Sequence, residues 1–107
     1  MSFLLAFLFA LLQVQASPRV VEISAKRFEF TPKEVHLRAG EPVTVRLVST
    51  DRSHGLLIKE LGIDLDAGDG APDSITITPS RAGTYPAICD HYCGSGHGNM
   101  RMTLIVE

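Results

Sequence analysis

The stretch PVTVRLVST, residues 42–50, alternates apolar and polar side chains over most of its length. Val43, Val45 and Leu47 fall on one face of an extended chain, and the residues between them are polar. A period of two residues is typical of a β-strand that buries one face and exposes the other. We therefore predict a strand here, in a sheet that turns one face toward a core.

Further segments on both sides have a similar character and are separated by Gly, Pro and Asp. They are rich in β-branched and aromatic residues: VVEISAKRFEF (20–30), EVHLRAGEP (34–42), SITIT (74–78), TYPAICD (84–90) and MRMTLIVE (100–107). In contrast, LGIDLDAGDGAPD (61–73) is rich in Gly and Asp, and we predict a long irregular connection there. Short strands at this spacing, with no sustained helical period after the first residues, predict an all-β sandwich of Greek-key type over residues 17–107.

Length and charge narrow the functional classes. The 107 residues suffice for one domain, because single cores commonly form at about 100–150 residues. The net charge of -2 gives no electrostatic reason to expect nucleic acid as a partner. We find no internal repeat.

The N-terminal segment MSFLLAFLFALLQVQAS has no charged side chain and is apolar without interruption from Phe3 to Leu12. As a helix, this run would span roughly 15 Å, against about 30 Å of bilayer hydrocarbon. Small residues at positions 14 and 16 fit a signal-peptidase site, so we predict an export signal over residues 1–16, with a short anchor as the alternative. The protein would then be exported, to the periplasm or the outer face of the cytoplasmic membrane, with membrane association possible through a partner or an uncleaved leader.

The stretch CDHYCGSGHGNM, residues 89–100, contains two cysteines, two histidines and a methionine. Two cysteines in an exported chain are most often a disulfide. However, three glycines let this segment wrap its side chains around a point, which a disulfide does not need. Thiolate, imidazole and thioether together are ligands of copper sites, whereas zinc sites are built from Cys, His and carboxylates. The candidate ligands in this segment are Cys89, Cys93, His97 and Met100, and both interpretations remain open on these residues alone.

A further ligand is expected from elsewhere in the chain. His54, in the stretch TDRSHGLLI, follows the strand predicted to end near Thr50. It can therefore lie at the same end of the sandwich as the C-terminal cluster. A lone histidine is more often structural or solvated, so the order of His54 relative to the cluster is what favours a ligand role.

The ligands in this order resemble the dinuclear copper A (CuA) domain of cytochrome c oxidase subunit II, shared with nitrous oxide reductase. The family pattern is an upstream His followed by C-x-[E/W]-x-C-x-x-x-H-x-x-M. The stretches HGLLIKELGIDLDA (54–67) and AGTYPAICDHYCGSGH (82–97) are also similar to subunit II segments, so the resemblance covers roughly residues 27–107.

The resemblance implies a cupredoxin fold and two copper ions. Cys89 and Cys93 would bridge both coppers through their sulfurs, and one copper would also take His54 and Met100. Such a centre implies an electron carrier, whose partner is a redox protein such as a cytochrome c or an oxidase subunit. No catalysis is expected from this chain alone.

The second copper would take His97 and the backbone carbonyl of His91. The family usually has Glu or Trp at position 91, so the imidazole there is a departure. The sequence also has no Trp, whereas subunit II normally receives electrons through an aromatic patch.

Two alternatives come from other functional classes. A copper chaperone or buffer that delivers the metal to an oxidase is favoured by the small size and by the missing Trp. A binding module with a Cys89–Cys93 disulfide is the interpretation without a metal.

Other polar residues receive simpler interpretations. His36 is expected on the surface, and Met102 in the core. An acidic segment is predicted to be a solvated turn, or alternatively a patch that steers a basic partner; its residues are Asp64, Asp66, Asp69 and Asp73.

Overall fold

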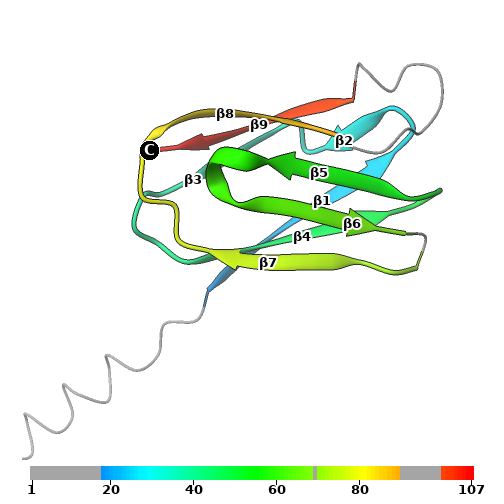
Figure 1. Ribbon diagram of the computed structural model, residues 1–107, viewed down its shortest axis with the longest axis horizontal. Helices are drawn as coiled ribbons and strands as arrows, with labels where there is room; N and C mark the ends of the chain where they lie inside the picture. The colour runs from blue at the N-terminus through cyan, green and yellow to red at the C-terminus, as the bar shows by residue number, and fades with distance from the viewer. Residues whose placement is uncertain (1–17, 69, 90–99) are drawn as a thin grey trace, which may run out of the picture.

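The computed structural model describes residues 18–68, 70–89 and 100–107 of the chain (Figure 1). The described elements are β1 (Arg19–Lys26), β2 (Glu29–Thr31), β3 (Glu34–Leu37), β4 (Val43–Ser49), β5 (His54–Ile58), the 3-10 turn η1 (Lys59–Leu61), β6 (Ile63–Ala67), β7 (Asp73–Ile77), β8 (Gly83–Ile88) and β9 (Arg101–Val106).

The strands form two sheets packed face to face (Figure 1). One sheet has the order β2-β1-β4-β7, and the other has the order β3-β9-β8-β5-β6. The pairs β1/β4 and β3/β9 are parallel, and the remaining neighbours are antiparallel. The predicted all-β sandwich is confirmed.

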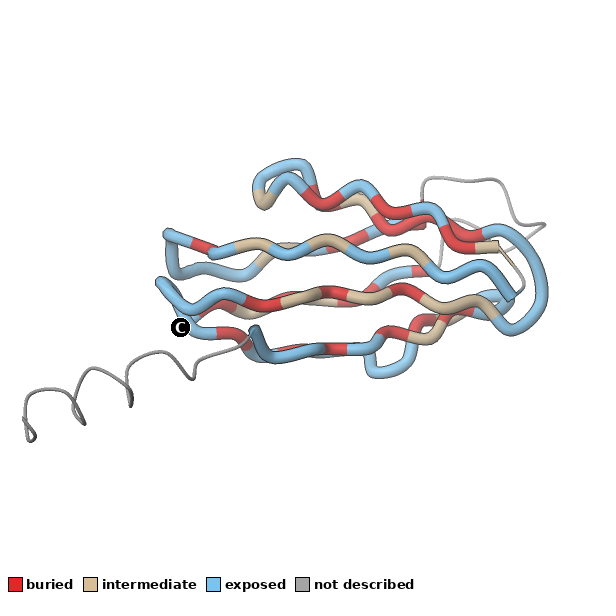
Figure 2. Tube along the Cα trace, turned by 90° about the horizontal axis from the view of Figure 1, so that it is seen from below, coloured by how far each residue is buried: buried red, intermediate tan, exposed pale blue. Residues whose placement is uncertain are grey.

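The core lies between the two sheets and is built from alternate residues of most strands (Figure 2). In β4, Val43, Val45 and Leu47 are buried while the residues between them are partly exposed, as the sequence pattern predicted. In β9, Met102 and Leu104 point inward from the opposite sheet. Each fully buried apolar side chain of this size contributes about 1.5–3 kcal/mol relative to its exposed state.

Two sequence-based expectations about strands need correction. Segment 20–30 is not one continuous stretch, because the chain turns at Arg27–Phe28 and returns as β2 alongside β1. Segment 61–73 is not irregular throughout, since β6 occupies its centre and pairs with β5 from Ile63 to Ala67. The inward and outward alternation of β6 matches a half-buried strand despite its aspartates.

The predicted leader, residues 1–16, lies outside the described residues. Among those that are described, no helix has the length and apolar character needed to cross a membrane.

Three strand ends meet at one end of the sandwich (Figure 1). β5 begins at His54, β8 ends one residue before Cys89, and β9 begins one residue after Met100. The pairing of β8 with both β5 and β9 therefore brings three of the predicted ligands together.

Candidate metal centre

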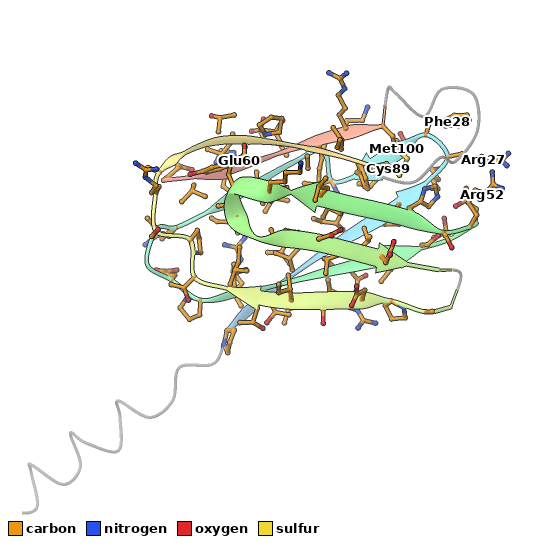
Figure 3. The ribbon with its side chains drawn as sticks, viewed as in Figure 1. Arg27, Phe28, Arg52, Glu60, Cys89 and Met100 are labelled. Carbon is orange, nitrogen blue, oxygen red and sulfur yellow. The ribbon has the colours of Figure 1, made fainter. Side chains whose placement is uncertain are left out.

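His54, Cys89 and Met100 are all buried at this end of the molecule, with exposed fractions of 0%, 3% and 1%. Nδ1 of His54 lies 3.9 Å from Sγ of Cys89. The backbone N–H of Cys89 donates to the carbonyl of Met100 at 3.3 Å, which joins the two ends of the C-terminal cluster. Figure 3 shows Cys89 and Met100 side by side where β8 ends and β9 begins.

The other predicted ligands, His91, Cys93 and His97, lie outside the described residues. Within the described ranges, no three His, Cys, Asp or Glu side chains gather as a metal site would require. A complete site therefore depends on ligands from residues 90–99.

Asp51 is a residue of this region that the sequence interpretation missed. Its Oδ1 lies 2.6 Å from Nε2 of His54 and accepts the N–H of Arg52 at 2.7 Å, while its Oδ2 accepts the N–H of Arg27 at 2.8 Å. The sequence did place this carboxylate three residues before a candidate ligand, which could have pointed to a contact with His54. Nothing in the sequence indicated its contact with Arg27, which is 24 residues away.

The protonation of Asp51 follows from these contacts. Partial burial opposes ionisation, but the hydrogen bonds from Arg27, His54 and Arg52 outweigh it and lower the pKa of Asp51 to about 2. The carboxylate is therefore ionised at neutral pH and can only accept hydrogen bonds.

The described donor set fits a copper ion better than a hard cation. It presents a thiol or thiolate, an imidazole and a thioether, and soft sulfur ligands select Cu(I) while imidazole suits copper in general. All three side chains are buried, and Cys89 and Met100 belong to the hydrophobic core, so little water reaches them. The ligand roles of His54, Cys89 and Met100 stay a prediction.

The acidic segment has a different structure from the predicted turn. Asp64 and Asp66 are exposed on the outward face of β6. The carboxylate of Asp73 accepts the N–H groups of Asp66 at 3.0 Å and Ser74 at 2.9 Å, so it organises the start of β7. Asp69 lies outside the described residues.

His36 is exposed on β3, as predicted, but both ring nitrogens have carboxylate partners. Nδ1 lies 2.6 Å from Oε1 of Glu107, and Nε2 lies 2.9 Å from Oε1 of Glu34. Both hydrogen bonds raise the pKa of His36 above its usual value, and the one to Glu107 has the larger effect. Met102 is buried in β9, as expected.

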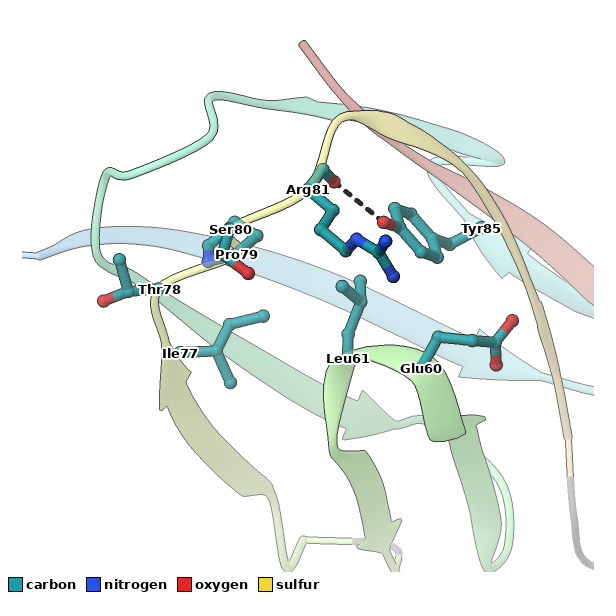
Figure 4. Close-up of a pocket in the computed structure, with 8 residues that line it drawn as sticks. All are labelled: Glu60, Leu61, Ile77, Thr78, Pro79, Ser80, Arg81 and Tyr85. Atoms are coloured by element: carbon teal, nitrogen blue, oxygen red, sulfur yellow. Dashed lines mark hydrogen bonds between the residues drawn. The ribbon is translucent and has the colours of Figure 1, made fainter.

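A cavity of about 200 Å³ lies at the other end of β8, away from Cys89 (Figure 4). Leu61, Ile77 and Arg81 line it together with Tyr85, whose hydroxyl donates to the carbonyl of Arg81 at 2.8 Å. Its lining includes no His, Cys or Met, so it offers no copper ligand of the predicted kinds.

Comparisons with known proteins agree with this fold. The cupredoxin-like domain family matches residues 1–106. The chain is 29% identical over 98 residues to cytochrome c oxidase subunit 2 of Thermus thermophilus, which covers 92% of this chain and 73% of that protein. It spans 58% of a second subunit 2 sequence from Thermus thermophilus.

Two solved structures share the architecture at low sequence identity. The periplasmic domain of cytochrome oxidase subunit II from Bradyrhizobium japonicum superposes with a TM-score of 0.77 at 15% identity, covering 88% of this chain and 87% of that chain. Auracyanin A, a blue copper protein from Chloroflexus aurantiacus, superposes with a TM-score of 0.69 at 18% identity, covering 85% of this chain and 100% of that chain. The fold, the core and the family match together show that this chain belongs to the cupredoxin-like domain family.

Proposed function

We propose that this domain carries electrons through a dinuclear copper centre of the CuA type. The observation that carries the proposal is the approach of His54 Nδ1 to Cys89 Sγ, both buried at one end of a cupredoxin sandwich. Met100, also buried, is joined to Cys89 by a backbone hydrogen bond. A second cysteine, Cys93, follows four residues after Cys89. A site with one copper has no use for a second thiolate at this spacing.

The described residues supply one half of the ligand set. His54 and Met100 would bind one copper, and Cys89 would bridge to the other through its sulfur. Cys93 would form the second bridge. When bound, such a pair of bridged coppers shares one unpaired electron, which permits transfer with little change in geometry.

The other copper would take His97 and the backbone carbonyl of His91. A carbonyl ligand depends on the backbone rather than on the side chain, so the unusual imidazole at position 91 leaves this part of the proposal intact.

The relatives support the coarser part of the proposal. Their names describe oxidase subunits and a blue copper protein. We accordingly assign an exported location, since one of these structures is a periplasmic domain, and a redox protein such as a cytochrome c or another oxidase subunit as partner.

Copper loading of the reduced protein tests the proposal. We expect two coppers per chain, and a spin-resonance spectrum in which the unpaired electron couples to both copper nuclei. A single copper with one intense blue absorption band would overturn the dinuclear assignment. Protein purified without reductant that holds a stable Cys89–Cys93 bond, and takes up no copper after reduction, would instead support the disulfide-containing binding module.

Replacing one cysteine gives a second test. Cys93→Ser removes a bridge that a hydroxyl cannot replace, so coupling to two nuclei should disappear completely. Retention of an unchanged dinuclear spectrum in this variant would contradict the assignment of Cys93.

A further inference from the structure

We propose that Asp51 is a positioning residue of the metal centre, holding the His54 ring with Nδ1 directed at Cys89. This inference rests on the proposed function, because it gives Asp51 a role toward a ligand of the same site. It is supported by the contacts that hold the Asp51 carboxylate, by the direction of the hydrogen bond between His54 and Asp51, and by the burial of the His54 ring.

The carboxylate of Asp51 is itself held from two sides. Oδ2 accepts the N–H of Arg27, in the turn between β1 and β2, at 2.8 Å. Oδ1 accepts the N–H of Arg52, in the connection between β4 and β5, at 2.7 Å. Both oxygens are therefore anchored to backbone, and the carboxylate provides a fixed acceptor for the imidazole.

This acceptor determines which ring nitrogen carries the hydrogen. Oδ1 of Asp51 already accepts the N–H of Arg52 and lies 2.6 Å from Nε2 of His54. Nε2 must therefore be the donor, since the opposite tautomer would set two lone pairs against each other. In the neutral ring, Nδ1 then has the free lone pair. It faces Sγ of Cys89 at 3.9 Å, on the side where the metal would bind.

The burial of His54 makes this control necessary. The side chain has no exposed surface, so water cannot supply an alternative partner for Nε2. Carboxylates that accept the second ring N–H of a metal-binding histidine fix its tautomer and orientation, and their loss typically lowers metal affinity by about 10- to 100-fold.

Three variants separate positioning from general structural support. Asp51→Ala removes all three acceptor contacts. In Asp51→Asn, the side-chain oxygen can still accept from His54 and Arg52, but the amide NH2 group then faces the N–H of Arg27. This variant should therefore keep the tautomer of His54 and lose the hydrogen bond to Arg27. Asp73→Ala is the matched control, because this carboxylate also accepts two backbone N–H groups but does not contact a candidate ligand.

The first measurement uses the copper-free, reduced full chain. Two-bond proton–nitrogen correlation of the imidazole rings reports directly which nitrogen of His54 is protonated. We expect Nε2–H in the wild type, in Asp51→Asn and in Asp73→Ala, and a mixture of tautomers in Asp51→Ala. Nδ1–H in the wild type would overturn the proposal, as would an unchanged tautomer in Asp51→Ala.

The second measurement is Cu(I) affinity by competition with a chromophoric chelator. Asp51→Ala should bind about 10- to 100-fold more weakly than the wild type, while Asp51→Asn should lose less. Asp73→Ala should match the wild type. Equal losses in Asp51→Ala and Asp73→Ala would show a general structural effect and refute positioning.

Failure of the proposed function gives a different result. If the wild type bound one copper, or none, the dinuclear assignment would fall while the tautomer of the copper-free protein still decided the role of Asp51. If Asp51→Ala does not fold, the wild-type tautomer and the affinity of Asp51→Asn decide it. Nε2–H with a loss of affinity smaller than about 10-fold supports the proposal, and Nδ1–H or a larger loss refutes it.

Discussion

Two methionines separated by one residue provide a matched test of the proposed ligand set. Met100 precedes β9 and is assigned to a copper, whereas Met102 lies within β9 and is assigned to the core. Both side chains are almost completely buried. Substituting each by leucine removes the thioether sulfur while nearly conserving volume.

The structure predicts similar effects of the two substitutions on copper-free stability. Hydrophobic exchanges that conserve volume usually cost less than about 1.5 kcal/mol. For a domain of this size, 1 kcal/mol corresponds to roughly 4–8 °C in Tm, so the melting temperature should fall by no more than about 12 °C in either variant. Thermal unfolding of the reduced, copper-free proteins measures this effect.

The two variants should differ once copper is added. Met100→Leu should keep both coppers, because a thioether would be the weakest ligand of the set, but its reduction potential and visible spectrum should change. Met102→Leu should keep the potential and spectrum of the wild type. Protein-film voltammetry decides the question: equal displacement of the potential in both variants, or none in Met100→Leu, would refute the assignment of Met100.

Two further predictions concern the scaffold. Phe30→Ala should lower the free energy of unfolding by about 3–5 kcal/mol, since Phe30 is fully buried. Phe28→Ala is the control and should lower it far less, because Phe28 is 37% exposed. Similar losses of both variants in chemical denaturation would contradict the assignment of Phe30 to the core. Hydrogen bonds to Glu107 and Glu34 raise the pKa of His36 in the folded protein. The stabilising contribution of protonated His36 should therefore be full below about pH 6.5, the pKa of an unfolded His, and should disappear as the pH rises through the pKa of the folded state. The difference in Tm between wild type and His36→Gln should therefore shrink from pH 5.5 to pH 8.5, and an unchanged difference would refute this prediction.

Strands with a clear period of two could be predicted from the sequence, and β6 shows where that approach failed. Ile63, Leu65 and Ala67 do alternate with exposed residues in β6. The exposed residues are aspartates, and glycines flank the segment, so local composition indicated a loop. Pairing with β5 overrides these weak local preferences, because it places the apolar residues in the core.

The candidate site was predictable to the extent that it depends on residue order. The sequence gives His54 followed by the cysteine cluster, and β-strand pairing then brings His54 to Cys89. The role of Asp51 was not predictable in the same way. One of its donors is the backbone of Arg27, a group that every residue except proline has, and only the folded chain brings it within 2.8 Å.

The pairing of the strands brings the ends of the proposed metal centre together without a metal. Ile88 pairs with both Leu57 of β5 and Arg101 of β9, and the next residue, Cys89, donates its N–H to the carbonyl of Met100. The two ends of segment 90–99 are therefore held together by backbone hydrogen bonds that do not depend on copper. The entropy of closing this loop is lost during folding of the sheet, so binding of copper at the proposed site would not have to offset it. Mutations that weaken the pairing of β8 with β9 should consequently lower copper affinity even when no ligand is changed.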